Sequence, residues 1–276
     1  MATKIQWTEE TWNPISGCRR KSPGCQNCYA ERQAHRLAGN PNEKIRALYS
    51  GITQITNGRP GWTGECGISE NALLKPLRTR KPTTYFISLS DLFYDGRTDE
   101  DIDRVFSVMQ RARQHTFQIL TKYVERAYDY LSLFRRHSVD GFVTRGGKSI
   151  DFSCGPVFDP ARWPLPNVWL GVSVEDRQRK QRIDVLRQTP SAVRFLSLEP
   201  LLEDIGTLNL CGIDWVIAGA ESGPGARPAR EEWFRSIKDQ CVAAGVPFFL
   251  KQYADERGRK IGLPELDGRQ WVEMPR

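Results

Sequence analysis

Short apolar runs alternate with longer amphipathic runs along most of the chain. The apolar runs are rich in β-branched and aromatic side chains, which is typical of buried parallel strands. They span Tyr85–Leu89, Phe117–Leu120, Val168–Val174, Val193–Leu198, Trp215–Ala218 and Phe248–Leu250. Helical patterns cover Tyr29–Leu37, Thr98–Gln114, Tyr123–Leu133, Asp176–Arg187 and Arg230–Ala244. The alternation predicts an α/β fold with a parallel sheet or barrel.

Two segments break this rhythm. Residues 40–67 are rich in Gly, Asn, Thr and Pro, and they predict a loop with at most a short hairpin. Residues 138–166 contain several Gly and Pro residues and predict a loop-rich insertion that can cover or line a site. A chain of 276 residues with 39% hydrophobic content can bury one large core, so we expect a single domain over residues 1–276.

The chain is basic, with a net charge of +7 and an isoelectric point of about 9.1. This charge favours a polyanionic partner such as DNA or RNA. The basic clusters are Arg19–Lys21, Arg78–Lys81, Arg135–Arg136 and Arg177–Arg182. Each cluster alone is better explained as a solvated surface, whereas two together are equally well explained as a surface that follows phosphates.

The sequence has no apolar span of about 20 residues and no signal peptide pattern at its start, so we expect a cytoplasmic protein without membrane contact. A reducing cytosol disfavours disulfides, and the seven cysteines are then free to ligate metals or to pack in the core. Cys211 and Cys241 have apolar neighbours and are expected in the core. Cys66 and Cys154 lie in Gly-rich loops and are not assigned.

Three cysteines are clustered with the spacing C-x6-C-x2-C, at Cys18, Cys25 and Cys28. Three thiolates suffice to hold a [4Fe-4S] cubane with one iron left open. The amino and carboxylate groups of S-adenosylmethionine can bind that iron, and an electron from an external donor then cleaves the sulfonium to a 5′-deoxyadenosyl radical. A zinc site would need a fourth ligand from Cys66, Cys154 or His35. Three unliganded structural cysteines are a third interpretation, and the spacing favours the cluster.

Every predicted strand ends in polar residues. They are Ser88, Ser90 and Asp91, then Thr121 and Lys122, Ser173 and Glu175, Ser197 and Glu199, Glu221 and Ser222, and Lys251 and Gln252. In parallel α/β barrels the carboxyl ends of the strands meet on one face and build the active site. Helix capping explains Ser90, Thr121 and Ser173 equally well.

Glu199, Glu221 and Lys251 are the candidate catalytic residues. A charge directly behind an apolar strand must be paired or bound to a ligand. Glu199 and Glu221 are therefore also candidates for cofactor binding. The Gly-rich loop at residues 219–228 can hold a phosphate or the methionine moiety with its amides. It lacks the G-x-x-x-x-G-K-[ST] pattern, so ATP hydrolysis is not expected.

The motifs, taken in order from Trp7 to Trp271, resemble an uncharacterised phage and prophage protein family with a three-Cys radical-SAM-like motif. The matching segments are WTEETWNPISGCRRKSPGCQNCYAERQAHRL, SLSDLFY, FQILTK, PNVWLGVSVED, VRFLSLEPLLEDI, DWVIAGAESGPGARP, DQCVAAGVPFFLKQ and LDGRQW. This family is distantly similar to spore photoproduct lyase, and its frequent genetic neighbour is the three-Cys-motif partner. The resemblance implies a partial (β/α)6-type radical-SAM barrel with an added strand and loop insertions.

The resemblance also implies a set of cofactor contacts. Cys18, Cys25 and Cys28 would ligate the cluster, and Tyr29 directly follows the third ligand as in the spore photoproduct lyase branch. The methionine amine would contact Ser88, Ser90 and Asp91, and the ribose would contact Ser173 and Glu175. The usual motif is C-x3-C-x2-C with an aromatic residue before the last cysteine, whereas Asn27 stands there in this chain. Adenine stacking is therefore expected to differ.

The implied function is a radical S-adenosylmethionine enzyme that abstracts hydrogen from a nucleic-acid base or sugar, for repair or modification. Its expected partners are S-adenosylmethionine, an electron donor, DNA or RNA, and a three-Cys-motif partner protein. The resemblance places it in the host cytoplasm as a phage-encoded protein. The alternative is a zinc-stabilised nucleic-acid-binding phage protein without catalysis.

Overall fold

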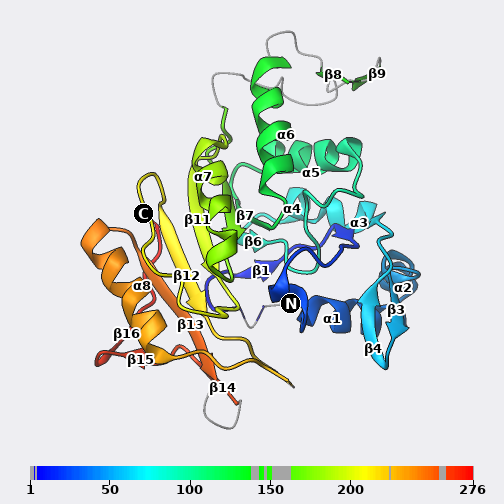
Figure 1. Cartoon of the computed structure of the whole chain (residues 1–276). Helices are drawn as coiled ribbons and strands as arrows, with labels where there is room; N and C mark the ends of the chain where they lie inside the picture. Colours follow the sequence, from blue (N-terminus) through cyan, green and yellow to red (C-terminus); the bar gives the residue numbers. More distant parts are fainter. Residues whose placement is uncertain are drawn as a thin grey trace.

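A computed structural model describes residue 3 and residues 5–137, 143–145, 148–150, 163–223, 225–254 and 259–275. The fold is mixed α/β and is built on a curled eight-stranded sheet (Figure 1). In spatial order the strands are β1 (Glu10–Thr11), β6 (Thr84–Phe86), β7 (Thr116–Thr121), β10 (Val168–Ser173), β11 (Val193–Leu198), β12 (Trp215–Gly219), β13 (Phe248–Ala254) and β14 (Lys260–Gly262). Neighbours from β1 to β13 pair in parallel, and β14 is antiparallel to β13.

The six predicted strands are confirmed as β6, β7, β10, β11, β12 and β13. The five predicted helices are confirmed, and the structure places them at α1 (Tyr29–Ala38), α5 (Asp99–Arg111), α6 (Val124–His137), α7 (Gln181–Gln188) and α8 (Glu231–Ala244). The Thr98 side chain caps α5 by accepting from the Asp101 amide, and three acidic residues follow in its first turn. α8 ends where Gly245 takes the left-handed conformation, with a φ of 67°. The predicted α/β fold with a parallel sheet is therefore correct.

The loop predicted for residues 40–67 is wrong in part. It contains the helix α2 (Glu43–Tyr49) before the hairpin of β3 (Thr53–Thr56) and β4 (Arg59–Trp62). The Asn42 side chain caps α2 by accepting from the amides of Lys44 and Ile45. Tyr49 is the buried residue of α2 and packs in a small cluster with Ala30 and Ala34 of α1. A helix with so few buried positions has no apolar period to detect.

Other short elements were not predicted. They are β1, β2 (Ile15–Ser16), β5 (Gly67–Ile68), α3 (Glu70–Leu73), α4 (Lys75–Arg78), β15 (Glu265–Leu266) and β16 (Arg269–Gln270). The start of the helix predicted at Asp176–Arg187 is a 3₁₀ turn, Arg177–Arg179, before α7. In the predicted insertion at residues 138–166 the structure describes the hairpin of β8 (Val143–Arg145) and β9 (Lys148–Ile150), and residues 163–166. The rest of that prediction lies outside the described residues.

The two faces of the sheet differ in what they contact. Apolar strand residues such as Val172, Leu196 and Val216 pack with the helices in the main core. The opposite face carries an aromatic cluster around Trp7, which includes Phe86, Phe195, Trp215 and Phe249. On this face the strand residues become polar toward their carboxyl ends, as β11 and its exit show with Phe195, Ser197 and Glu199. The aromatic cluster closes one end of the sheet, and the polar end is left for a site.

Gly171 is a tight packing position in β10. A Cβ atom at this residue would overlap the ring of Phe195, which is fully buried in the aromatic cluster. We predict that Gly171→Ala lowers the free energy of unfolding by about 1–3 kcal/mol, because an overpacked core must shift its side chains. Gly61→Ala in β4 is the matched control, since its Cβ would meet no atom within 4 Å. Equal unfolding midpoints in urea for the two variants would contradict the prediction.

Candidate functional site

A pocket of about 1110 Å³ lies at the carboxyl ends of the parallel strands. Most of the polar strand-end residues predicted from the sequence line it: Ser88, Ser90, Asp91, Thr121, Lys122, Ser173, Ser197, Glu199, Glu221, Ser222, Lys251 and Gln252. Glu175 does not line the pocket. The structure therefore brings together the residues that the strand pattern predicted to meet.

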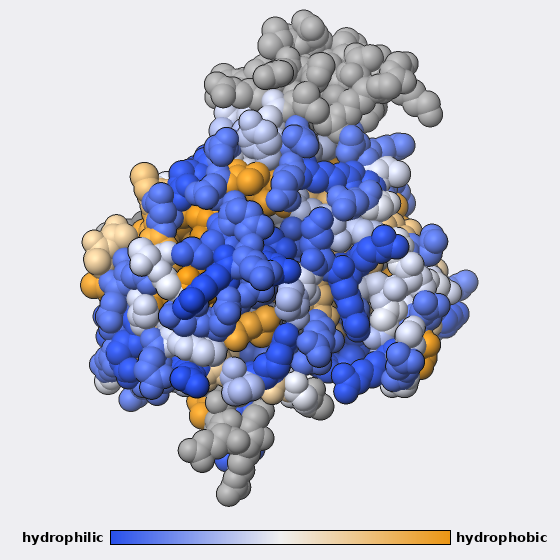
Figure 2. Space-filling view, in the orientation of Figure 1, coloured by the Kyte–Doolittle hydropathy of each residue, from blue (hydrophilic) through white to orange (hydrophobic). Residues whose placement is uncertain are grey.

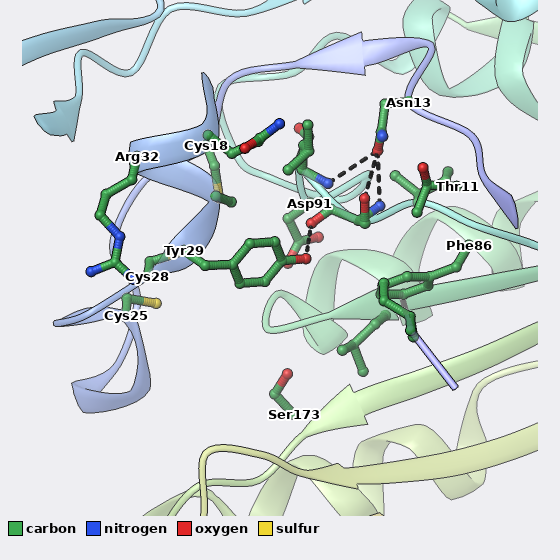
Figure 3. A pocket seen from close by; sticks show the side chains of 18 of the residues that line it. Thr11, Asn13, Cys18, Cys25, Cys28, Tyr29, Arg32, Phe86, Asp91 and Ser173 are labelled. Atoms are coloured by element: carbon green, nitrogen blue, oxygen red, sulfur yellow. Dashed lines mark hydrogen bonds between the residues drawn. The ribbon is translucent and has the colours of Figure 1, made fainter. Parts of the chain in front are cut away.

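The cysteine loop, residues 17–28, forms one wall of this pocket. Cys18, Cys25 and Cys28 all line the pocket, and Figure 3 shows them on one side of it, across from Ser173 of β10. Cys28 is the N-cap residue of α1. The amide of Lys21 donates to the sulfur of Cys25 at 3.5 Å, and helix starts and amide donors both favour a thiolate. The three sulfurs are thus presented to the same space.

Burial raises the pKa of the Cys18 thiol and of the Cys28 thiol, and the neighbouring cysteines add to the shift. A metal that binds these sulfurs must therefore displace protons. Among the residues that the structure describes, no three His, Cys, Asp or Glu side chains meet at a point suited to one metal ion. A cubane does not need such a point, because each of its thiolates binds a different iron. Three soft sulfur donors on one wall fit that kind of group.

Glu175 anchors the tip of the cysteine loop. Its carboxylate has no exposed surface, and it is paired with Lys122 and with Arg182, the latter at 3.0 Å. The hydroxyl of Ser22 donates to Glu175 Oε1 at 2.5 Å. Burial raises the pKa of Glu175, but the two cations outweigh it and hold this pKa below its usual range. A Cβ at Gly24 would lie 2.5 Å from Glu175 Oε1, so a glycine is needed where the loop passes this carboxylate.

Glu221 anchors the other side of the same loop. It accepts two hydrogen bonds from the side chain of Arg227, at 2.5 and 2.9 Å, and one from Asn27 Nδ2 at 2.9 Å. Arg227 also donates to the Pro23 carbonyl at 3.0 Å. These contacts, with the backbone amide of Arg227, hold the pKa of Glu221 below its usual range although burial raises it. The Gly-rich loop at 219–228 is therefore folded against the cysteine loop.

The residues after β6 are largely engaged within the protein. Asn13 Oδ1 accepts from both the amide and the hydroxyl of Ser88, and Ser90 donates to the Gly17 carbonyl at 2.5 Å. Asp91 is buried and accepts from the Thr121 hydroxyl at 2.7 Å and from two backbone amides. Burial nevertheless raises the pKa of Asp91. These three predicted cofactor contacts hold the start of the cysteine loop and the ends of β6 and β7.

Tyr29 extends from α1 across the pocket, and its hydroxyl donates to the Ser88 carbonyl at 2.6 Å (Figure 3). The side chain is 52% exposed, so its ring faces open space in the pocket. Ser173 is buried at the end of β10 and lines the pocket from the opposite side. Tyr29 and Ser173 therefore offer an aromatic surface and a hydroxyl to a ligand.

Glu199 and Lys251 form an ion pair at the end of the sheet, with 2.5 Å between Lys251 Nζ and Glu199 Oε1. Gln252 is buried beside them and donates to the Ala220 carbonyl at 2.7 Å. Its Oε1 atom is buried and accepts no hydrogen bond in the described part of the protein. Gln252 also lines the pocket, but this buried atom is not open to a ligand unless its neighbours move.

A family model described as protein of unknown function, DUF5131, matches residues 2–275. The chain belongs to the DUF5131 family. No curated protein matches it, and no solved structure matches it. In the part of the chain that the structure describes, the helices are too short or too polar to span a bilayer.

Of the predictions for the other cysteines of this DUF5131 member, one is confirmed and one is wrong. Cys241 is fully buried in the core, as predicted. The core position predicted for Cys211 is wrong, because it lies in an exposed turn before β12. Its neighbours Leu208 and Leu210 are buried in the core, but the turn that begins at Cys211 leaves this side chain exposed. Cys66 is half-buried, and Cys154 lies outside the described residues. His35 accepts from or donates to Thr53 on the protein surface.

Several residues that line the pocket or support its walls were not identified from the sequence. Asn13 and Arg97 support the cysteine loop: Arg97 is buried and donates to the Ser16 carbonyl at 2.8 Å and to the Ser90 hydroxyl at 3.1 Å. The asparagine follows the two-residue strand β1, which has no detectable pattern. Arg32 and Arg36 of α1 also line the pocket. Their spacing of four, with no acidic partner on the same helix face, is the signal that could have identified them.

Proposed function

We propose that this chain is a radical S-adenosylmethionine enzyme that holds a [4Fe-4S] cluster on Cys18, Cys25 and Cys28. One observation carries the proposal: the three thiols share a pocket with the polar carboxyl ends of the parallel strands. When bound, such a cluster supplies the electron that splits S-adenosylmethionine into methionine and a 5′-deoxyadenosyl radical. A curled parallel sheet that carries the cysteines after its first strand supports a partial radical-SAM barrel, with β14 as the added strand.

The residues around the cysteines position them. Glu175 and Glu221 anchor the tip and the far side of the cysteine loop through Ser22 and Asn27. Loops that must hold a metal group need such support, because outer contacts fix the direction of each ligand. In this proposal Glu175 orients ligands and does not bind a ribose. Glu221 has the same positioning role, because its carboxylate is occupied by Arg227.

The pocket has free groups for S-adenosylmethionine beside the cysteines. The ring of Tyr29 lies in the pocket beside the cysteines, and Ser173 offers a hydroxyl to the ribose. Lys251 and Glu199 form the ion pair at the pocket wall where a proton can be held or moved near a substrate.

Anaerobic purification and reconstitution with iron and sulfide test this proposal. We expect about four iron and four sulfide per chain. We also expect 5′-deoxyadenosine, measured by liquid chromatography, when dithionite and S-adenosylmethionine are added. Stoichiometric zinc without iron uptake would overturn the proposal in favour of a zinc-stabilised nucleic-acid binder. A full cluster with no 5′-deoxyadenosine would leave an iron–sulfur protein and overturn the proposed reaction.

A further inference from the structure

The helix α1 packs through its small residues and presents long polar side chains to the pocket. Ala30 and Ala34 are buried against Tyr49 and Leu89. The pocket side carries Tyr29, Arg32, Gln33 and Arg36. The helix is thus oriented by its small buried residues, and this orientation directs two arginines one turn apart toward the pocket.

Arg32 and Arg36 are exposed and have no ion pair or hydrogen-bond partner within the described part of the chain. Lys44, at the start of α2, also lines the pocket and is exposed without a partner there. Figure 3 shows Arg32 on the same wall as Cys25 and Cys28. Like charges four residues apart on a helix repel each other and destabilise it. A nearby anion would remove this cost.

Among the described residues that line the pocket, no carboxylate is free to supply that anion. Glu221 is held by Arg227, and Glu199 by Lys251. Asp91 is engaged by the Thr121 hydroxyl and by backbone amides. The pocket rim formed by Arg32, Arg36 and Lys44, here called the α1–α2 rim, therefore keeps its positive charge. Hydrophilic side chains cover much of the molecular face shown in Figure 2.

The basic cluster 177–182, by contrast, is occupied within the protein. Arg177 pairs with Asp204 at 3.1 Å, Arg179 with Asp176 at 3.3 Å, and Arg182 with the buried Glu175. Lys180 donates to the Thr207 carbonyl. A contiguous basic run is therefore a poor guide to where an anion binds in this chain. The separated cations of the α1–α2 rim are the better candidates.

The pocket is also large and partly aromatic. Its volume of about 1110 Å³ exceeds the range of about 300–1000 Å³ that suits one small ligand. The exposed ring of Tyr29 and the side chain of Trp62 line it. Aromatic rings stack on nucleobases without regard to sequence, and enzymes that act on a base extract it into such a pocket. There is room for a base beside a bound cofactor.

We propose that a nucleic-acid strand binds along the α1–α2 rim, with its phosphates on Arg32, Arg36 and Lys44 and an unpaired base in the pocket near Tyr29. This inference rests on the proposed function for the chemistry that follows binding, and it names the substrate class of that site. Binding itself needs only the α1–α2 rim and the ring of Tyr29. It is therefore measurable on the cluster-free protein.

The test compares two double variants that remove the same charge. Arg32→Ala/Arg36→Ala changes the α1–α2 rim. Arg80→Ala/Lys81→Ala removes two exposed cations just before β6, at the amino ends of the parallel strands, whereas the pocket lies at their carboxyl ends. Fluorescence anisotropy with a labelled single-stranded oligonucleotide of about 16 nucleotides gives the affinity at several salt concentrations. We expect the rim variant to bind about tenfold more weakly. The slope of log affinity against log salt concentration should fall in magnitude by about 1.4, because each of the two lost phosphate contacts removes about 0.7. The control variant should bind like the unmodified protein.

Three results would overturn the inference. They are no binding of any single-stranded DNA or RNA by the unmodified protein, equal weakening in both double variants, or full competition by equimolar mononucleotide. Tyr29→Leu provides a second arm, and loss of one stacked base should weaken binding by about 5–150-fold. Binding by the cluster-free chain without 5′-deoxyadenosine formation in the reconstituted chain would sustain the rim and refute only the proposed reaction.

Discussion

Cys25→Ala is expected to abolish cluster retention and to reduce 5′-deoxyadenosine formation by more than about a hundredfold. Loss of an outer-shell contact alone costs about 10–100-fold in metal affinity, and Cys25 would be a direct ligand. The side chain is half-buried in a loop held by Ser22 and Glu175, so its removal should leave the fold intact. Iron and sulfide content after anaerobic reconstitution and chromatography of 5′-deoxyadenosine measure the two effects.

Cys211→Ala is the matched control for this variant. Cys211 is exposed and precedes β12, so it lies at the amino ends of the parallel strands, away from the pocket at their carboxyl ends. We expect its iron content and 5′-deoxyadenosine formation to equal those of the unmodified chain. Wild-type product formation by Cys25→Ala would show that Cys25 is not a ligand. An equal loss in both variants would show that the assay reports general thiol damage.

The long elements of the fold were predictable because each has a clear hydrophobic period. The runs that became β7, β10 and β11 are buried on both faces, and their apolar sequences leave no alternative. β1 has only two residues and exists because β6 pairs with it. α2 is stabilised by its Asn42 cap and by one buried tyrosine, which are tertiary and local effects that periodicity does not detect.

The location of the pocket was predictable, but the partners of its charges were not. Parallel strands place their carboxyl ends together, so Glu199 and Lys251 were expected on the same face of the fold. The sequence did not indicate that Glu175 would be neutralised by Lys122 and Arg182, because two strand exits and the helix α7 converge there. The orientation of α1, which directs Arg32 toward the pocket, likewise depends on tertiary contacts of its alanines.

Glu175→Gln is expected to lower the free energy of unfolding by about 3–5 kcal/mol, which urea denaturation of the metal-free protein measures. Glutamine keeps the shape of the side chain but leaves Lys122 and Arg182 without their negative partner, and Arg182 is only 6% exposed. Breaking a buried ion pair from one side costs this much because the remaining charge is uncompensated. The exposed pair of Asp184 and Arg187 is the control, and Asp184→Asn should cost less than about 1 kcal/mol.

The difference in unfolding free energy between the unmodified chain and Glu175→Gln should depend on pH, which gives a second test of the same ion pair. The pKa of Glu175 is lowered in the folded protein, so its contribution is complete above the unfolded pKa of about 4.3 and is lost as pH falls through the folded value. The gap between the unmodified chain and Glu175→Gln should therefore be constant near neutral pH and shrink in acid. A gap no larger than that of Asp184→Asn at neutral pH would mean that Glu175 does not anchor the buried cations. The cysteine loop, which reaches this carboxylate through Ser22, would then need another support.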